Sequence, residues 1–357
     1  ANFTIGTPPQ PASAFIDVGG LLVWTQCSQC SSSSCFNQEL PPFDPTKSST
    51  YRPEPCGTAL CEFFPASIRN CSGDVCAYEA STQLFEHTSG KIGTDAVAIG
   101  TATAASVAFG CVMASDIKLM DGGPSGFVGL ARTPLSLVAQ MNVTAFSHCL
   151  APHDGGGGKN SRLFLGAAAK LAGGGKSAAM TTPFVKSSPD DIKSLYYLIN
   201  LEGIKAGDEA IITVPQSGRT VLLQTFSPVS FLVDGVYQDL KKAVTAAVGG
   251  PTATPPEQFQ SIFDLCFKRG GVSGAPDVVL TFQGAAALTV PPTNYLLDVG
   301  DDTVCVAIAS SARLNSTEVA GMSILGGLQQ QNVHFLYDLE KETLSFEAAD
   351  CSSLSPN

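Results

Sequence analysis

Phe15-Ile16-Asp17-Val18-Gly19-Gly20 is the stretch that decides the fold, because an apolar strand here runs into an aspartate and two glycines. In the second half, the apolar run Val221-Leu222-Leu223 leads in the same way into Gln224. Gly129 and Gly326, each preceded by two apolar residues, follow Asp17 and Gln224 at similar distances along the chain. Such repeated spacing indicates an internal duplication at the scale of half the chain. A glycine at each of these places would let two segments approach closely.

The length of 357 residues is sufficient for two lobes, each with its own core. A charged fraction of 14% with 35 glycines and 23 prolines favours an all-β class with minor α content. We expect the lobes to span 1–182 and 183–357, with the boundary in the polar segment 183–193. No apolar run approaches the ~18 residues of a membrane span. The net charge of −11 argues against nucleic-acid binding, which needs basic surface.

Several short apolar runs bounded by turn residues predict strands. They are 163–165, 196–199, 278–282 and 333–337. One long helix is predicted from Asp234, as its capping residue, to a stop at Gly249. Its apolar face would carry Val236, Leu240, Val244 and Val248.

Twelve cysteines admit metal binding, a thioredoxin-like redox role, which would need a βαβ context that is absent, or disulfides. A structural zinc site would need a second Cys or His pair at regular spacing, and the four histidines are scattered. We therefore predict six disulfides formed in an oxidising compartment, with no metal and no cofactor. Four N-x-S/T sequons, at Asn2, Asn70, Asn142 and Asn315, fit the same secretory route. The chain opens on a strand-like segment, so we expect a leader to have been removed or to lie outside this sequence.

Motifs along nearly the whole chain carry a resemblance to a known family. They are Ile5-Gly6-Thr7-Pro8-Pro9-Gln10, Leu22-Val23-Trp24-Thr25-Gln26-Cys27, Phe43-Asp44-Pro45, Ser48-Ser49-Thr50-Tyr51, Pro134-Leu135-Ser136-Leu137, Ile324-Leu325-Gly326-Gly327, Gln329-Gln330-Gln331-Asn332, Tyr337-Asp338 and Leu344-Ser345-Phe346. With them the chain resembles plant pepsin-like aspartic proteases of the nepenthesin type. The resemblance implies two β-rich lobes flanking a deep cleft.

The same resemblance implies a disulfide pattern. The implied pairs are Cys27–Cys111, Cys30–Cys35, Cys56–Cys76, Cys61–Cys71, Cys149–Cys351 and Cys266–Cys305.

The departures from the family fall at its chemistry. Proteolysis in this family needs one ionised and one protonated aspartate, and Gln224 stands where the second is expected. Val18 replaces a Thr that ties the two site loops together, and Gly20 replaces a Ser beside the first Asp. Phe226, which follows Thr225, replaces a Gly of the family. We therefore expect a remnant cleft without a functional catalytic residue, built from Asp17, Val18, Gly19, Gly20, Thr82, Gln224, Thr225 and Phe226.

Thr82 enters this set because Thr82-Gln83-Leu84 stands where the family's flap has Tyr-Gly-Asp. The alternative is a slipped register that leaves a true second aspartate nearby. Asp234 is the candidate within reach, although its place at a helix start suits a capping role better.

Plant xylanase inhibitors and xyloglucanase inhibitors share these features. They have twelve cysteines and a secreted two-lobed body, and they have lost the pair of catalytic aspartates. The leading hypothesis is thus a non-proteolytic, monomeric, secreted apoplastic defence protein. It would inhibit a microbial cell-wall-degrading glycoside hydrolase, whose identity the sequence leaves open. Two alternatives stay open: a pseudoprotease that binds a peptide or protein in the remnant cleft, and an atypical aspartic endopeptidase.

By resemblance, the inhibitory loop would be 309–321, with Arg313, Leu314 and Glu318. A basic side chain there could pair with the two catalytic carboxylates of a retaining glycosidase, which stand ~5–5.5 Å apart. Arg313 is the one basic residue of this segment, although an exposed arginine is more often a solvated surface charge. The Asn315 sequon could also place a glycan in the way.

Overall fold

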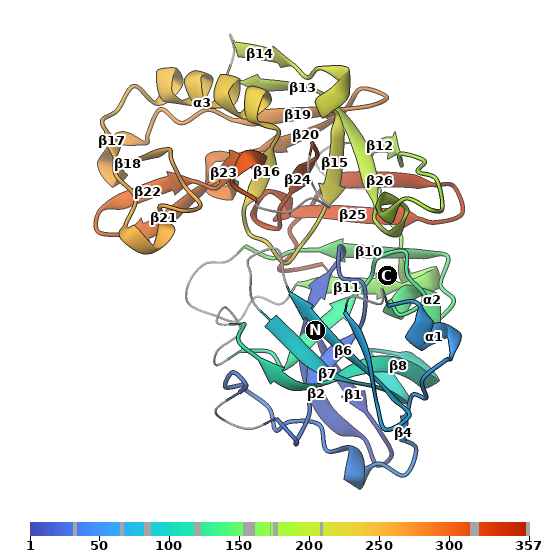
Figure 1. Ribbon diagram of the computed structural model, residues 1–357. Helices are drawn as coiled ribbons and strands as arrows, with labels where there is room; N and C mark the ends of the chain where they lie inside the picture. Colours follow the sequence, from blue (N-terminus) through green and yellow to red (C-terminus); the bar gives the residue numbers. More distant parts are fainter. Residues whose placement is uncertain are drawn as a thin grey trace. The chain divides into compact units, whose positions relative to one another are not determined.

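The computed structural model describes the chain apart from ten short segments. These are 31–33, 65–67, 82–86, 118–122, 153–160, 172, 174–177, 208–209, 315–320 and 355–357. The chain divides into two compact units, Ala1–Val143 and Thr144–Asn357 (Figure 1). No described helix is long and apolar enough to cross a membrane.

The first unit is built on one nine-stranded sheet. Its strands are β1 (Asn2–Ile5), β2 (Gln10–Asp17), β3 (Trp24–Gln26), β4 (Arg52–Pro53), β5 (Arg69–Ser72), β6 (Val75–Ser81), β7 (His87–Ile99), β8 (Ala102–Ser115) and β9 (Gly126–Gly129). They are ordered β1-β2-β9-β3-β8-β7-β6-β5, with β4 on β7. Because β1 also pairs with β7, six of these strands close into a ring. Two single-turn helices accompany the sheet, α1 (Ala59–Glu62) and α2 (Leu137–Gln140).

The second unit contains three sheets and one long helix. A five-stranded sheet is ordered β11-β10-β25-β26-β12, from β10 (Ala145–Cys149), β11 (Arg162–Leu165), β12 (Met180–Pro183), β25 (Val333–Asp338) and β26 (Thr343–Ala348). An eight-stranded sheet is ordered β20-β19-β13-β15-β24-β16-β23, with β14 on β13. Its strands are β13 (Leu198–Ala206), β14 (Ala210–Thr213), β15 (Thr220–Leu223), β16 (Ser230–Leu232), β19 (Val278–Phe282), β20 (Ala286–Val290), β23 (Ile308–Ser310) and β24 (Ser323–Leu325). The third sheet is ordered β17-β18-β22-β21, from β17 (Thr252–Ala253), β18 (Cys266–Lys268), β21 (Leu296–Gly300) and β22 (Thr303–Val306).

The fold agrees with the all-β, minor-α prediction. The predicted strand 278–282 is β19, and 163–165 and 333–337 lie within β11 and β25. The run 196–199 enters a strand at Leu198, two residues later than predicted. The lobe boundary at 182/183 stays a prediction. Three strands that begin before residue 183, β10, β11 and β12, share a sheet with β25 and β26 from the end of the chain.

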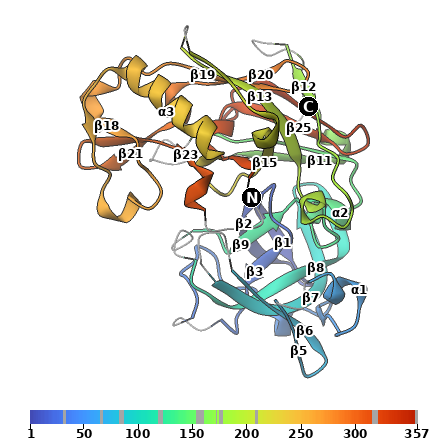
Figure 2. The same cartoon turned by 45° about the horizontal axis from the view of Figure 1, so that its top comes forward.

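The long helix is α3 (Asp234–Val248), which lies against the eight-stranded sheet in both views (Figures 1 and 2). The predicted apolar face is buried, together with Tyr237, and Gly249 ends the helix in a left-handed conformation. The predicted capping role of Asp234 is wrong. Val233 is the N-cap and makes no side-chain capping bond, whereas the Asp234 carboxylate accepts hydrogen bonds from Ser310 Oγ and Gln238 Nε2.

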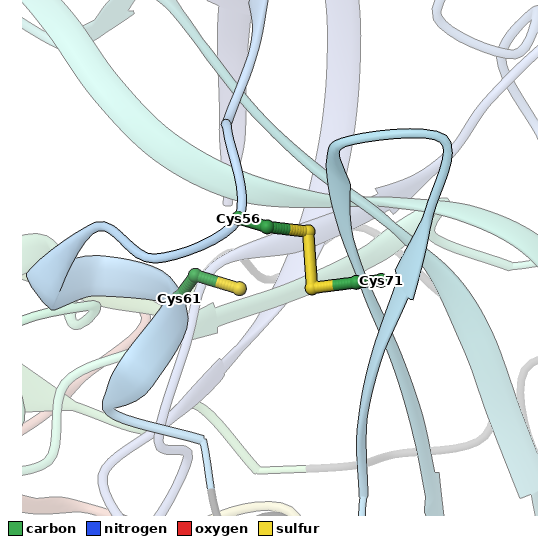
Figure 3. Close-up of side chains that lie close together, drawn as sticks. All are labelled: Cys56, Cys61 and Cys71. Atoms are coloured by element: carbon green, nitrogen blue, oxygen red, sulfur yellow. A yellow bond between two sulfur atoms is a disulfide. The ribbon is translucent and has the colours of Figure 1, made fainter.

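Six disulfides are present, as predicted, and all twelve cysteines are paired. Four of the expected pairs are confirmed: Cys27–Cys111, Cys30–Cys35, Cys149–Cys351 and Cys266–Cys305. Two are wrong, because the structure pairs Cys56 with Cys71 (Figure 3) and Cys61 with Cys76. Burial explains the exchange of partners. Cys61 on α1 and Cys76 on β6 both lie in the core with Phe64 and Tyr78, whereas Cys71 is exposed.

Candidate functional site

Asp17 ends β2 at the turn that the sequence singled out. β2 runs parallel to β9, with Asp17 opposite Gly129. The backbone N–H of Gly19 donates to Asp17 Oδ1 at 3.1 Å, and the Asp17 carbonyl accepts from the N–H groups of Gly20 and Leu130. The side chain is nearly buried, at 8% exposure, and the adjacent Val18 is fully buried. The turn therefore fixes the carboxylate through its own backbone.

Gln224 occupies a similar place in the second unit. It follows β15, which runs parallel to β24. Its N–H donates to the Leu325 carbonyl at 3.2 Å, and its carbonyl accepts from Gln330 Nε2 at 2.8 Å. The side chain is half-buried, as are those of Thr225 and Phe226. The position thus carries an amide on a well-anchored backbone.

Two glycines show that the Asp17 and Gln224 turns are built alike. A Cβ on Gly129 would lie 2.5 Å from the Gly20 carbonyl oxygen and 2.4 Å from that of Leu22. A Cβ on Gly326 would lie 2.9 Å from the Ser227 carbonyl oxygen and 2.5 Å from that of Val229. These carbonyls belong to the third and fifth residues after Asp17 and after Gln224. The internal duplication inferred from the sequence therefore has a structural counterpart in each unit, with Asp17 and Gln224 at equivalent positions.

Asp234 lies in a different environment from either turn. It begins α3, and its Oδ1 accepts from Ser310 Oγ at 2.7 Å and from Gln238 Nε2 at 3.2 Å. These hydrogen bonds, that from Ser310 first, lower the pKa of the Asp234 carboxyl. Asp234 therefore connects the helix start to the end of β23.

The segment 309–321 is described up to Leu314 and again from Gly321. Ser311–Arg313 forms a single 3-10 turn after β23. Arg313 Nη1 donates to the carbonyls of Gln260 and Ser261 at 3.1 and 3.3 Å. Leu314 packs against the buried cluster of the second unit. Glu318, the Asn315 sequon and the flap residue Thr82 lie outside the described residues.

The sequence does not indicate a cluster in which Asp264 contacts Arg313, Lys241 and Tyr237, which we call the acidic hub. Asp264 lies 3.4 Å from Arg313 Nη2 and 3.0 Å from Lys241 Nζ, and it accepts a hydrogen bond from the Tyr237 hydroxyl. Although burial opposes ionisation, these hydrogen bonds and the two cations lower the pKa of the Asp264 carboxyl. The hub joins α3, the segment before β18 and the 309–321 loop. No local pattern marks it, because its members are far apart in the sequence.

A cavity of about 660 Å³ opens beside β6 and β7 in the first unit. It is lined by Ser34, Cys35, Phe36, Glu79, His87, Ser89, Ala114, Ser115, Asp116 and Ile117. No described residue of the remnant-cleft set lines it. The described part of the chain offers one group of sulfurs close enough to share a metal ion, Cys56, Cys61 and Cys71 (Figure 3). Their disulfides remove them as thiolate ligands.

Three of the four sequons fall on described residues. Asn2 on β1, Asn70 on β5 and Asn142 after α2 are all exposed. Asn142 adopts a positive φ of 50°, as asparagine often does in turns. Exposure makes these three positions accessible for modification, and glycosylation there stays a prediction.

Two family models match the chain in succession. The xylanase inhibitor N-terminal model matches residues 1–167, and the xylanase inhibitor C-terminal model matches residues 196–348. Among curated proteins, aspartic proteinase nepenthesin-1 of Nepenthes gracilis is 32% identical over 363 residues, covering 99% of this chain and 78% of that protein. Aspartyl protease 37 of Oryza sativa subsp. japonica is 29% identical, covering 98% of this chain and 80% of its own length.

Solved structures support the fold alone. Basic 7S globulin from soybean superposes with a TM-score of 0.69 at 18% identity, covering 98% of this chain and 94% of the globulin. Conglutin gamma from lupine seeds gives 0.68, also at 18% identity, covering 97% of this chain and 90% of conglutin. The chain therefore belongs to the family of nepenthesin-type plant aspartic proteases, and its two halves match the xylanase inhibitor N-terminal and C-terminal models.

Proposed function

We propose that this chain is a secreted, non-proteolytic member of its family that inhibits a microbial cell-wall-degrading glycoside hydrolase, a xylanase or a xyloglucan-specific endoglucanase. The observation that carries the proposal is Gln224. It holds, in the second unit, the position that Asp17 holds in the first, where proteolytic relatives need a second aspartate. An amide can hold a water molecule but does not ionise in the accessible pH range, so it cannot serve as an acid or a base. Gln224 therefore cannot act as the protonated acid that proteolysis in this family requires.

The surroundings of Asp17 support the loss of proteolysis. A Cβ on Gly20 would lie 3.1 Å from Asp17 Oδ2, so a serine there would bring a hydroxyl beside the carboxylate. Glycine supplies no such donor. Val18 is fully buried and carries a methyl group where a threonine would offer a hydroxyl. Phe226 places a ring where the family's glycine leaves the backbone open to a substrate. Each change removes a different element of the protease site.

Inhibition is supported by the two family models, which are named for xylanase inhibitors and together span most of the chain. Six disulfides fit a protein made for an oxidising compartment such as the apoplast. A two-carboxylate glycosidase site is an anionic target that a basic or hydrogen-bonding loop can occupy. We assign that loop to 309–321.

Arg313 can serve inhibition in two ways, and its contacts favour the indirect one. Its guanidinium already has three acceptors within the protein: two carbonyls and the Asp264 carboxylate. It therefore holds the base of the loop against the segment 260–264. In the direct alternative, Arg313 would leave Asp264 and pair with the target's carboxylates. The two roles predict different effects on inhibition when the Asp264 carboxylate is removed.

The test is inhibition of purified fungal xylanases and xyloglucan-active endoglucanases by the wild type and by matched variants. Stoichiometric loss of one target's activity supports the proposal. If Arg313 anchors the loop, Arg313→Ala and Asp264→Asn should weaken inhibition to a similar extent. If Arg313 binds the target directly, Asp264→Asn should leave inhibition intact or strengthen it. Lys186→Ala, which removes an exposed positive charge elsewhere, is the control.

Asp17→Asn completes the set, because an inhibitor that acts through a loop of the second unit should not depend on Asp17. No inhibition and no complex with any enzyme of the panel would overturn the proposal. A peptide ligand that is lost in Asp17→Asn or Phe226→Ala would instead favour the pseudoprotease alternative.

A further inference from the structure

Four cysteines of the first unit form two disulfides that lie side by side. Cys56 precedes α1 and pairs with Cys71 on β5, whereas Cys61 within α1 pairs with Cys76 on β6. The sulfur atoms of Cys56, Cys61 and Cys71 all lie within 4.8 Å of one another (Figure 3). A sulfur of one disulfide is thus close to both sulfurs of the other.

The two disulfides differ in their access to solvent. Cys71 is exposed and Cys56 is half-buried, whereas Cys61 and Cys76 are fully buried. Thiol–disulfide exchange requires a thiolate to reach a disulfide sulfur. A thiol from solution can therefore reach Cys71, and it is excluded from the inner pair.

We propose that Cys71 is a modification site for low-molecular-weight thiols, and that this modification starts an exchange between the two disulfides. An external thiolate attacks Cys71 Sγ and forms a mixed disulfide there, and the bonding electron pair leaves with Cys56 as a thiolate. The Cys56 thiolate attacks Cys61 Sγ, forms the Cys56–Cys61 disulfide and expels the Cys76 thiolate.

The register of the β5–β6 hairpin completes the exchange. Cys71 and Cys76 lie directly opposite each other on the two strands. The Cys76 thiolate therefore attacks the mixed disulfide at Cys71, forms the Cys71–Cys76 disulfide and releases the external thiolate. The number of disulfides is unchanged and no oxidant or reductant is consumed, so the thiol acts as a catalyst.

The exchange changes what the disulfides connect. In the starting arrangement both join the hairpin to the segment around α1 and close loops of sequence separation 15. After exchange, one lies within the hairpin and the other within the α1 segment. The hairpin is then held to that segment by its hydrogen bonds, Cys56 N–H to Asp74 O and Cys76 N–H to Glu54 O, and by Phe64 stacked on Tyr78. Cys71 thus controls how firmly the hairpin is tethered.

The first experiment treats the wild-type protein with millimolar reduced glutathione at mildly alkaline pH, where an ordinary thiol is partly ionised. Alkylation then traps the products for disulfide mapping by mass spectrometry. We expect a glutathione adduct at Cys71 and a growing fraction of Cys71–Cys76 and Cys56–Cys61 peptides. The internal control is Cys30–Cys35, a half-buried disulfide outside the close sulfur group. It should react without exchanging partners. The proposal fails if Cys30–Cys35 reacts while all four clustered cysteines keep their original pairs.

A second experiment uses no external thiol. Cys71→Ser leaves Cys56 with a free thiol next to Cys61. We expect part of this variant to carry the Cys56–Cys61 disulfide, with its free thiol on Cys76. The matched variant Cys35→Ser leaves Cys30 free outside the sulfur group, so its thiol should remain on Cys30. A free thiol confined to Cys56 in Cys71→Ser would overturn the exchange step.

Discussion

At the scale of single residues, the chemistry of this protein depends on several positions rather than on one. Under the proposed function, Gln224 stands in place of the second carboxylate, and Val18, Gly20 and Phe226 lack the contacts that support the pair in proteolytic relatives. Losing one member of a catalytic unit costs roughly 10⁴- to 10⁶-fold in rate, and the effects of its members do not add. Restoring one member should therefore recover little.

We expect the wild type to hydrolyse no denatured protein substrate between acidic and neutral pH. Gln224→Asp should stay at background, because Val18 and Phe226 remain. A variant that also carries Val18→Thr, Gly20→Ser and Phe226→Gly should gain activity that pepstatin inhibits. Wild-type activity that disappears in Asp17→Asn would contradict this prediction and would favour the atypical endopeptidase.

His148 makes stability depend on pH in a direction that its surroundings determine. It is fully buried on β10, and burial, followed by the neighbouring His334, lowers its pKa to about 3. Burial also lowers the pKa of His334. In the unfolded chain a histidine titrates near its ordinary value of about 6.5. Between about pH 3 and 6.5 the unfolded state therefore binds more protons.

The contribution of His148 to the free energy of unfolding should consequently be fully present above about pH 6.5 and decrease as the pH falls. The contribution of His148 is about 1.4 kcal/mol for each pH unit in that window. His148→Leu should lower stability near neutral pH yet show a shallower loss toward pH 4. Urea unfolding of both proteins at several pH values measures the difference in slope. Parallel curves for the two proteins would refute this role of His148.

At the scale of elements, Gly129 and Gly326 allow the close approach that builds each turn. An alanine Cβ at either place would lie 2.4–2.5 Å from a backbone carbonyl oxygen, which a side-chain rotation cannot relieve. We expect Gly129→Ala and Gly326→Ala each to lower the free energy of unfolding by about 3 kcal/mol.

The matched control is Gly235→Ala in the first turn of α3. A Cβ there would meet nothing within 4 Å, so alanine should be neutral or stabilise the helix by about 0.5 kcal/mol. Thermal unfolding of the three variants provides the measurement. If Gly129→Ala or Gly326→Ala melts like the wild type, the proposed close approach is not needed for stability.

The same scale shows what the sequence could predict. Runs with clear apolar patterns gave β19, β25 and the buried face of α3, because local burial determines those patterns. The anchoring of Arg313 on Asp264 could not be predicted, since these residues are far apart in the sequence and on different elements. The same holds for the two disulfides whose partners were predicted wrongly: the sulfurs of Cys56, Cys61 and Cys71 lie close together, and burial of Cys61 and Cys76 decides the partners. The capping role predicted for Asp234 was wrong because its carboxylate accepts a hydrogen bond from Ser310 instead of from the helix backbone.

At the scale of the whole molecule, the net charge of −11 makes a prediction about kinetics. Long-range electrostatic attraction speeds the encounter of oppositely charged proteins. Salt screens this attraction, because the Debye length falls from about 30 Å at 0.01 M to about 8 Å at 0.15 M ionic strength. If the proposed inhibition is correct, association with a basic xylanase should therefore slow about tenfold over this range, while dissociation changes little. Surface plasmon resonance at several salt concentrations separates the two rates. An acidic xylanase that is also inhibited is the control, and its association should not slow as salt increases. Equal salt dependence for both targets would mean that local contacts, rather than the overall charge, govern encounter.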